Sequence, residues 1–600
     1  MTAGNSAGGD DLRLVSMRDG KVTERTVTGL PPSAADFFVD GDSSQGTALL
    51  RYFMPDGEGI ALVDLASGAV VESRDTPGGY TLTDVTASET HIAWTDINSI
   101  SGVGLSVAPR GSGEAQRTAV GGGKLNVDLL GDWVLYSRKG SRTANYADPL
   151  HALTARSLKT GTTLKLLDHS WTILPTPDGA LLAEGGTVEH GEGLYRIALG
   201  ADGTPVVTLA ASTGEPTALT LLGSKLPSGV IDLDKTRTVP LEASFSRHNV
   251  RLVFELTHVA SQRRMVRVQV PYSTGAEGPV TISTSWDGRL DLQQGELGEF
   301  LAAYNGDYTW RIQATPMNGI GPAVERTGAF SVVRSAKPHD FSDNGSPDAL
   351  GIDSTGQLTR YDTAYRFDGL HYWTARTGLG TGWQIYDRLV AAGNVGGTAQ
   401  ADVLARDRSG ALWLYEGTGK PGQPLASRKK VGTGWQIYNR ITSGGDLTGD
   451  GKVDLLATDA AGALWLYKGT GSATAPLAYR VKVGHGWGMY NKIVATGNIA
   501  GGPAGDLVAR DASGVLWLYP GTGNGTFGSR LRIGSGWGAF AHLLSVGDAN
   551  RDGRPDLFAV RPDGITYVYE ATGNQLAPFK AGRTTISRLR PTPGEFTQLF

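Results

Sequence analysis

A repeat of about 50 residues occupies the last 260 residues of this 600-residue chain and limits the folds open to it. A Gly-Trp pair recurs four times, with the tryptophans Trp383, Trp435, Trp487 and Trp537. They are 52, 52 and 50 residues apart. A second motif, Leu-Trp-Leu-Tyr, recurs at residues 412–415, 464–467 and 516–519. Repeats of this length are typical of architectures in which each unit buries its apolar faces against its neighbours.

One period contains four short predicted strands, near residues 439–445, 453–458, 463–468 and 479–483, with Gly, Asp or Pro in every connection. Four strands in a unit of this length predict a β-propeller blade, and the chain has five such units. The first unit lacks the leading Gly-Trp strand, whereas residues 594–600 resemble that strand and have no blade of their own. We therefore predict a five-bladed propeller over residues 340–600, closed by the C-terminal strand so that no sheet edge stays free.

The repeats resemble known families. Residues 340–600 resemble the FG-GAP/VCBS repeats that are common in secreted actinobacterial proteins. The Gly-Trp strand, the four-stranded period and the count of five also resemble the five-bladed tachylectin lectins. The resemblance implies a propeller fold, but it says little about function because propellers host many activities.

Acidic loops lie between the first two strands of the units. Residues 446–454 and 548–556 place side-chain oxygens at positions 1, 3, 5 and 9, and the position 7 carbonyl can add another ligand. Alternating oxygens of this kind can surround a calcium ion. Alanine stands at position 12 and a strand follows, so the FG-GAP type of loop fits better than an EF-hand. The candidate ligands are Asp446, Thr448, Asp450, Lys452, Asp454, Asp548, Asn550, Asp552, Arg554 and Asp556.

A weaker calcium candidate precedes the first blade, with the residues Asp340, Ser342, Asn344, Ser346 and Asp348. The loops that begin at Asn394 and Asn498 keep only their two end residues and are expected to have lost the ion. We predict a structural calcium, which pins loops and does not catalyse. The alternative is that all of these segments are plain aspartate-glycine turns.

The first half of the chain repeats less clearly. We expect residues 1–9 to be a flexible N-terminus and residues 10–235 to form a second, divergent propeller of about five blades. Residues 216–222 and 229–233 are expected to complete the half-blade that begins at residue 12. A β-sandwich is the alternative for this region.

Residues 238–335 do not repeat. They alternate between apolar and polar residues, as in 251–256 and 265–270, in the manner of sandwich strands. They resemble the Ig-like module of flagellar hook-capping proteins, which implies an Ig-like β-sandwich that acts as a spacer. The predicted fold class is therefore all-β, with two β-propellers joined by an Ig-like sandwich.

Composition excludes several classes of protein. The net charge is only −4 and basic residues do not cluster, which argues against nucleic acid as a partner. The chain has no cysteine, so disulfides and zinc–thiolate sites are excluded. No apolar run is long enough for a membrane span. The first nine residues resemble the start of a mature chain after signal-peptide removal, which suggests an extracellular protein.

Catalytic motifs are weak. Residues 4–8 fit the nucleophile-elbow pattern but lack the strand that should precede it. We therefore predict a non-catalytic binding or adhesion protein whose partners are glycans, cell-surface polymers or another extracellular protein. The four Gly-Trp tryptophans are candidates for stacking on sugars, although the same rings suit a core between blades. The alternatives are a polysaccharide lyase or hydrolase with its site in the N-terminal propeller, or a protein-binding scaffold.

Overall fold

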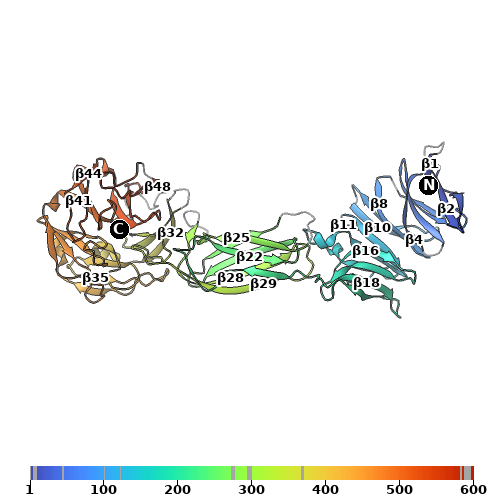
Figure 1. The fold of residues 1–600 in the computed structure, drawn as a ribbon, viewed down its shortest axis with the longest axis horizontal. Coiled ribbons are helices and arrows are strands. Elements are labelled where there is room, and N and C mark those ends of the chain that lie inside the picture. Colours follow the sequence, from blue (N-terminus) through green and yellow to red (C-terminus); the bar gives the residue numbers. More distant parts are fainter. Residues whose placement is uncertain are drawn as a thin grey trace.

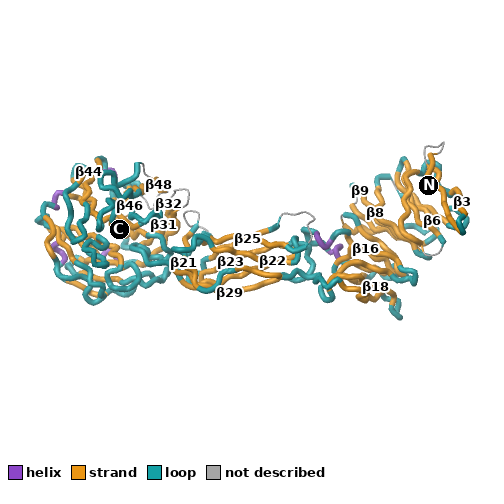
Figure 2. The backbone as a smooth tube through the Cα atoms, viewed as in Figure 1, coloured by secondary structure: helices purple, strands orange, loops and turns teal. Residues whose placement is uncertain are grey.

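The computed structural model describes residues 2–4, 10–43, 46–76, 78–100, 102–111, 113–121, 123–271, 278–292, 300–365, 371–581, 584–586 and 596–600. Three parts lie in a row, with the N-terminal domain at one end, a sandwich in the middle and a propeller at the other end (Figure 1). Strands and loops make up nearly all of the described chain, and only short helical turns interrupt them (Figure 2). The predicted all-β fold class is confirmed.

The C-terminal domain consists of five four-stranded antiparallel sheets, the blades 1 to 5. Blade 1 contains β49 (Phe596–Leu599), β30 (Asp348–Asp353), β31 (Leu358–Tyr365) and β32 (His371–Gly380). Blade 2 contains β33 (Tyr386–Gly393), β34 (Asp402–Asp407), β35 (Leu412–Tyr415) and β36 (Lys429–Gly432). Blade 3 contains β37 (Tyr438–Ser443), β38 (Leu455–Asp459), β39 (Leu464–Tyr467) and β40 (Val481–Gly484).

The last two blades have the same order of strands. Blade 4 contains β41 (Tyr490–Gly497), β42 (Asp506–Asp511), β43 (Leu516–Tyr519) and β44 (Leu531–Gly534). Blade 5 contains β45 (His542–Gly547), β46 (Asp556–Val560), β47 (Thr566–Tyr569) and β48 (Thr584–Ile586). Successive first strands contact one another, so they are the innermost strands around the axis of the ring.

The C-terminal strand completes blade 1. β49 runs antiparallel to β30, with Leu599 opposite Gly351. Leu350 and Phe600 exchange backbone hydrogen bonds of 2.8 and 2.9 Å. Leu599 and Phe596 join an apolar cluster to which blades 1 and 5 both contribute. The two ends of the propeller therefore meet in one sheet, and the edge of β30 is covered.

The Gly-Trp pairs form turns, whereas the sequence interpretation placed them in the leading strand. The tryptophans begin single 3-10 turns, which are η3 (Trp383–Ile385), η4 (Trp435–Ile437), η5 (Trp487–Met489) and η6 (Trp537–Ala539). The glycine before each turn has a left-handed backbone, with φ between 79° and 92°. Only glycine adopts that conformation without steric cost, which explains why a glycine stands there.

A sandwich of two sheets follows the N-terminal domain. One sheet contains β20 (Leu221–Lys225), β22 (Val239–Phe245) and β25 (Val280–Trp286). The other contains β21 (Val230–Asp232), β29 (Val324–Val333), β28 (Gly306–Pro316), β23 (Val250–His258) and β24 (Arg264–Gln269). A hairpin of β26 (Arg289–Leu290) and β27 (Leu301–Ala302) lies beside them.

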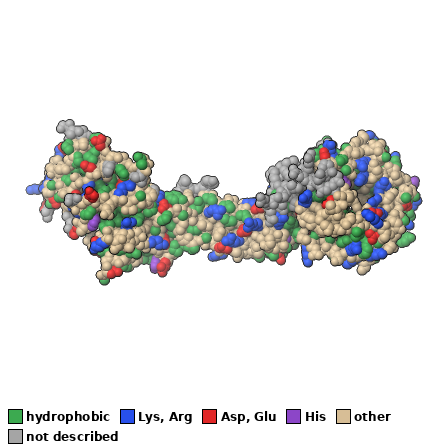
Figure 3. Space-filling model, turned by 180° about the vertical axis from the view of Figure 1, so that it is seen from behind, with side chains coloured by type: hydrophobic (Ala, Val, Ile, Leu, Met, Phe, Trp, Pro, Cys, Tyr) green, Lys and Arg blue, Asp and Glu red, His purple; other side chains and the backbone are tan. Residues whose placement is uncertain are grey.

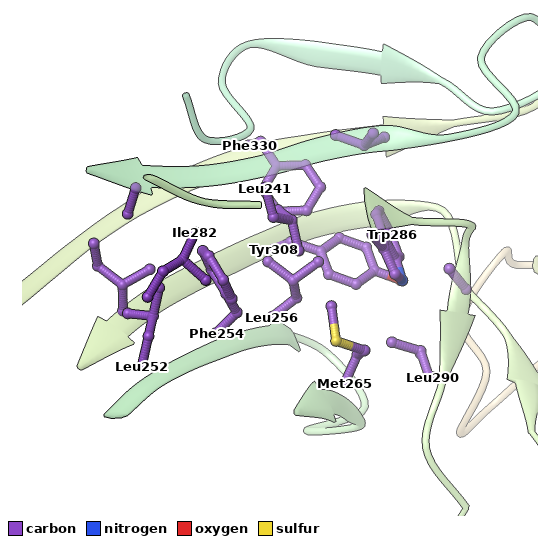
Figure 4. Packing of buried hydrophobic residues seen from close by; sticks show 14 of the residues in the cluster. Leu241, Leu252, Phe254, Leu256, Met265, Ile282, Trp286, Leu290, Tyr308 and Phe330 are labelled. Atoms are coloured by element: carbon purple, nitrogen blue, oxygen red, sulfur yellow. The ribbon is translucent and has the colours of Figure 1, made fainter. Parts of the chain in front are cut away.

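The sandwich core is closed by aromatic side chains (Figure 4). Tyr308 stacks on Phe330 with ring centroids 5.2 Å apart, and Trp286 packs against both rings. The Tyr308 hydroxyl donates a 2.9 Å hydrogen bond to the carbonyl of Tyr304, so its polar end is satisfied inside the core. Alternate residues of β22 and β23 are buried, in agreement with the alternation in the sequence.

The N-terminal domain contains five blade-like sheets, the first with three strands and the others with four. The first sheet contains β1 (Thr2–Gly4), β2 (Asp10–Arg18) and β3 (Lys21–Thr26). The second contains β4 (Ala35–Ser43), β5 (Thr47–Met54), β6 (Gly57–Asp64) and β7 (Val70–Asp75). The third contains β8 (Tyr80–Ala87), β9 (His91–Asn98), β10 (Gly102–Pro109) and β11 (Gln116–Gly121). The fourth contains β12 (Leu125–Leu130), β13 (Trp133–Arg138), β14 (Leu153–Ser157) and β15 (Thr163–Leu167). The fifth contains β16 (His169–Pro175), β17 (Leu181–Thr187), β18 (Gly191–Leu199) and β19 (Pro205–Ser212).

The predicted closure of the N-terminal domain is wrong. The segments expected to complete its first blade are β20 and β21, and they pair with β22 and β29 of the sandwich. Leu219, Leu221 and Ile231 pack against the sandwich core, which explains why β20 and β21 join the sandwich and not the first blade. The first sheet is completed by β1, within the segment expected to be flexible, although residues 1 and 5–9 lie outside the described chain. It lies at the end of the domain far from the sandwich (Figure 1).

Removal of Phe596–Phe600 is expected to destabilise the whole C-terminal propeller, because it uncovers β30 and opens the cluster between blades 1 and 5. Loss of the buried Leu599 side chain alone is worth about 2–5 kcal/mol. Scanning calorimetry of the full chain should show the propeller transition at a lower temperature. Removal of residues 1–4, as a control, should leave that transition in place. A propeller that melts unchanged without its last strand would contradict this closure.

Candidate functional site

The closing aspartate of each acidic loop is an anchor for the backbone. In blade 3, Asp454 accepts the N–H of Leu447 on one oxygen and the N–H of Gly469 on the other, both at 2.9 Å. Equivalent bonds recur in blades 2, 4 and 5. The closing aspartates are fully buried: Asp348, Asp402, Asp454, Asp506 and Asp556. This residue therefore ties the loop to the turn that follows the third strand, whether or not a metal ion is bound.

The opening aspartate of the blade 3 loop is wrapped by amides. Asp446 accepts backbone hydrogen bonds from residues 448 to 451 at 2.7–3.2 Å. Asp450 accepts the N–H of Lys452 at 3.0 Å. The blade 5 loop has the same arrangement around Asp548 and Asp552. The sequence pattern for calcium ligands is therefore also a pattern for carboxylates that cap turns.

The side-chain oxygens of these two loops are of the kind that binds a hard cation such as calcium. The buried hydroxyl of Thr448 interacts with the Asp454 carboxylate, so it adds a neutral oxygen beside this acid. Burial, together with repulsion from Asp552 and Asp548, raises the pKa of Asp556 to about 7. A cation would relieve that repulsion. Among the described residues, however, no three His, Cys, Asp or Glu side chains are arranged as a metal site, so the carboxylates would have to turn from the amides.

The weaker loop, around Asp340, lies against the sandwich. Asn305 donates its backbone N–H to the carbonyl of Asp343 at 2.7 Å and its side-chain amide to the Asp343 carboxylate at 2.9 Å. Burial raises the pKa of Asp340 to about 6. Arginine side chains supply positive charge here: Arg334 interacts with Asp340, and Arg360 interacts with Asp348. This loop therefore serves as a contact between domains, and arginine side chains lie near its carboxylates.

The four Gly-Trp tryptophans lie in the interior, between 5% and 9% exposed. Trp435 stacks on Tyr467 of the same blade at a centroid distance of 4.5 Å, and the hydroxyls of Tyr438 and Tyr467 are 2.6 Å apart. The corresponding rings of blades 2 and 4 repeat both contacts. Packing within and between blades accounts for these rings.

Three arginines that the sequence analysis did not single out cover these aromatic groups. The Arg480 guanidinium lies 4.2 Å from the Trp465 ring and donates to the Tyr438 hydroxyl at 2.6 Å. Arg428 and Arg530 make the same contacts in blades 2 and 4. Cation–π contact and hydrogen bond together fix each arginine on its blade. Their spacing of 52 and 50 residues was the signal that could have revealed them.

Blade 5 departs from this pattern and has a cavity. Phe540 and Tyr567 replace the tyrosine and the tryptophan of the other blades. A cavity of about 570 Å³ lies between the outer strand of blade 4 and the β47–β48 connection. We call it the blade 5 pocket, and its principal lining residues are Ile533, Trp537, Tyr569, Leu576, Phe579 and Lys580. It combines aromatic and aliphatic walls with one amino group, as small-ligand sites commonly do.

The N-terminal domain has a cavity of about 660 Å³ lined by its first strands. Asp40, Asp84, Asp128 and Thr172 lie on successive first strands at a constant spacing of 44 residues. Asp84 accepts the N–H of Val127, and Asp128 accepts a hydrogen bond from the Thr86 hydroxyl, each at 2.9 Å. Burial raises the pKa of Asp128 to about 6. These carboxylates connect adjacent sheets, and the 44-residue register is a signal that the sequence analysis missed.

The substitution Asp454→Ala is expected to destabilise the propeller by about 2 to 4 kcal/mol in EDTA, because two buried amides lose their acceptor. Asp450→Ala, at an exposed position with one amide partner, should cost less than about 1 kcal/mol. Denaturant unfolding with chelator present measures both. If the Asp454 variant is as stable as the wild type in EDTA, the anchoring role is wrong.

One segment of the C-terminal domain matches a known protein family. Residues 505–559 match the family described as FG-GAP-like repeat. They run from the second strand of blade 4 to the second strand of blade 5, which is one full period of the ring. No curated protein matches the chain. The C-terminal domain is therefore a β-propeller that contains an FG-GAP-like repeat.

Proposed function

We propose that the protein is a non-catalytic, extracellular binding or adhesion protein that recognises glycans or cell-surface polymers through its C-terminal propeller. The FG-GAP-like repeat indicates a propeller-type binding or adhesion protein. The observation that carries the glycan assignment is the blade 5 pocket. Its volume falls within the roughly 300–1,000 Å³ of typical small-ligand sites.

The pocket offers groups that suit a sugar. The rings of Trp537 and Tyr569 pack at a centroid distance of 4.6 Å with their planes tilted by 40°, and Phe579 packs against both. Such rings provide apolar surface for the C–H face of a sugar. At the rim, the Lys580 ammonium forms a 2.7 Å bond with Glu570 and lies 3.6 Å from Asp552. Leu576 is 81% exposed beside them, so the pocket opens to solvent.

The shape of the molecule supports a role in adhesion. Two broad end domains are separated by the narrower sandwich (Figure 3). The sandwich thus holds the propeller away from the N-terminal domain, as a spacer would. Among the described residues no helix is long and apolar enough to cross a membrane. Calcium on the loops of blades 3 and 5 would stiffen the propeller without taking part in chemistry.

Glycan retention tests the proposal. The full chain is applied to a glycan array beside a pocket variant, Leu576→Ala with Lys580→Ala, and beside Tyr479→Ala, which changes an exposed residue of blade 3. We expect the wild type and Tyr479→Ala to retain the same glycans and the pocket variant to lose them. Retained polysaccharide should keep its chain length. Absence of retention, or shortening of the polysaccharide, would contradict a glycan-binding protein, and shortening would favour an enzyme.

Calcium is expected to raise the melting temperature of the propeller transition, because an ion that binds only the folded loops stabilises the folded state. Asp450→Asn combined with Asp552→Asn should abolish the increase, since the amide keeps the hydrogen-bond acceptor but not the charge. Asp56→Asn, the same change at an exposed residue of the N-terminal domain, should preserve it. Identical melting curves of the wild type in calcium and in EDTA would remove the metal assignment.

A further inference from the structure

The innermost strands of the C-terminal propeller carry a ring of basic side chains. Arg388, Arg440 and Lys492 are the third residues of β33, β37 and β41. His542 of β45 and Gln598 of β49 occupy the equivalent positions, opposite equivalent residues of the second strands. The first four are 52, 52 and 50 residues apart, the period of the blades themselves. Five side chains therefore surround the propeller axis at one level, and we call them the axial ring.

Contacts between neighbouring blades hold these side chains near one another. The Arg388 guanidinium donates to the carbonyl of Asn439, the residue before Arg440, at 3.2 Å. The side-chain amide oxygen Oε1 of Gln598 accepts the backbone N–H of Leu389 at 3.0 Å. The axial ring is thus continuous across the closure between β49 and β33.

Within the described part of the chain, the cations of the axial ring have no carboxylate partner. The neighbouring acid Asp387 already accepts hydrogen bonds from the Nε and Nη2 atoms of Arg406, at 2.9 and 2.6 Å. The equivalent residues of the next two blades are asparagines, Asn439 and Asn491, which carry no charge. Among the described residues, no acid forms an ion pair with Arg388, Arg440 or Lys492. The ring therefore concentrates three cations without neutralising them.

The pKa values of the basic groups are lowered, as expected for cations that lie close together. Burial lowers the pKa of Lys492, and repulsion from Arg510, Arg388 and Arg440 lowers it further. Burial and then Arg388 lower the pKa of Arg440. Among the residues that the structure describes, no carboxylate acts in the opposite direction on either group. The fold thus holds these cations together against mutual repulsion, which a bound anion would relieve.

The axial ring lies at the end of the ring axis away from the sandwich. Its members stand near the start of the innermost strands, whereas the acidic loops follow the ends of those strands. The sandwich contacts the acidic-loop side, through Asn305 and the loop around Asp340. Arg388 is exposed, and Arg440, Lys492 and His542 are partly exposed. A ligand can therefore reach the axial ring without displacing another domain.

We propose that the axial ring binds a phosphate or sulfate group at the end of the propeller axis away from the sandwich. Two guanidinium groups and one ammonium group converge there, and guanidinium forks match the oxygens of these anions in pairs. The neutral side chains of His542 and Gln598 complete the ring with further hydrogen-bonding groups. A tetrahedral oxyanion with two charges suits three cations better than a single carboxylate. This site is separate from the blade 5 pocket and does not depend on the glycan proposal.

Isothermal titration calorimetry of the full chain tests the site, with inorganic sulfate in one arm and inorganic phosphate in the other. Both are titrated at constant ionic strength, with sodium chloride as the reference salt, because general screening must not be mistaken for binding. We expect one site per chain, and the anion with the lower Kd identifies the preferred group. Arg440→Gln combined with Lys492→Gln should weaken binding by at least about tenfold. Lys430→Gln, on the outer strand β36, should bind as the wild type does.

If the double variant binds no anion, its melting temperature shows whether it has lost the site or has failed to fold. Without oxyanion and at low salt, that variant should melt at or above the wild-type temperature, because repulsion has been removed. Sulfate or phosphate should raise the wild-type melting temperature and leave that of the variant unchanged. Failure of both anions to bind the wild type, or equal binding by the double variant, would overturn the proposal. If the pocket variant, Leu576→Ala with Lys580→Ala, no longer retains glycans but still binds the anion, the two sites are independent.

Discussion

Packing of each blade against both of its neighbours is the interaction on which the C-terminal propeller depends. Five apolar clusters lie between the blades, one for each pair, and the cluster between blades 5 and 1 includes β49. A single blade cannot bury both of its faces, so the ring is stable only when it is closed. Since Leu599 and Phe596 complete the last cluster, the final residues of the chain determine whether the other four interfaces persist.

Closure also gives the propeller two chemically different ends. Acidic loops anchored by residues such as Asp454 lie on the side of the sandwich, and the axial ring of Arg388, Arg440 and Lys492 lies on the other. The blade 5 pocket is at the periphery, where Phe540 and Tyr567 replace the tyrosine and the tryptophan of blades 2 to 4. Near-identical blades thus provide the scaffold, and departures from identity provide the candidate sites.

Sequence periodicity predicted the C-terminal propeller well, because blades 2 to 4 repeat the same large aromatic residues at one spacing and blade 5 keeps the Gly-Trp pair. It misplaced β20 and β21, since a short apolar strand has the same pattern in a blade and in a sandwich, and only packing decides between them. The role of Asp454 was not evident, because calcium ligands and turn-capping carboxylates share one pattern. The axial ring escaped notice because its residue types differ between blades and only the strand register brings them together.

The central claim is that the C-terminal propeller is one cooperative ring closed by its own C-terminus. Hydrogen–deuterium exchange under native conditions measures this directly, by giving an opening free energy for the amides of each blade. We expect the slowest amides of β30 and β46, in blades 1 and 5, to exchange with the same free energy as those of β38 in blade 3. Exchange of β30 at a much lower free energy than β38 would show that blade 1 opens by itself, and would contradict the closed ring.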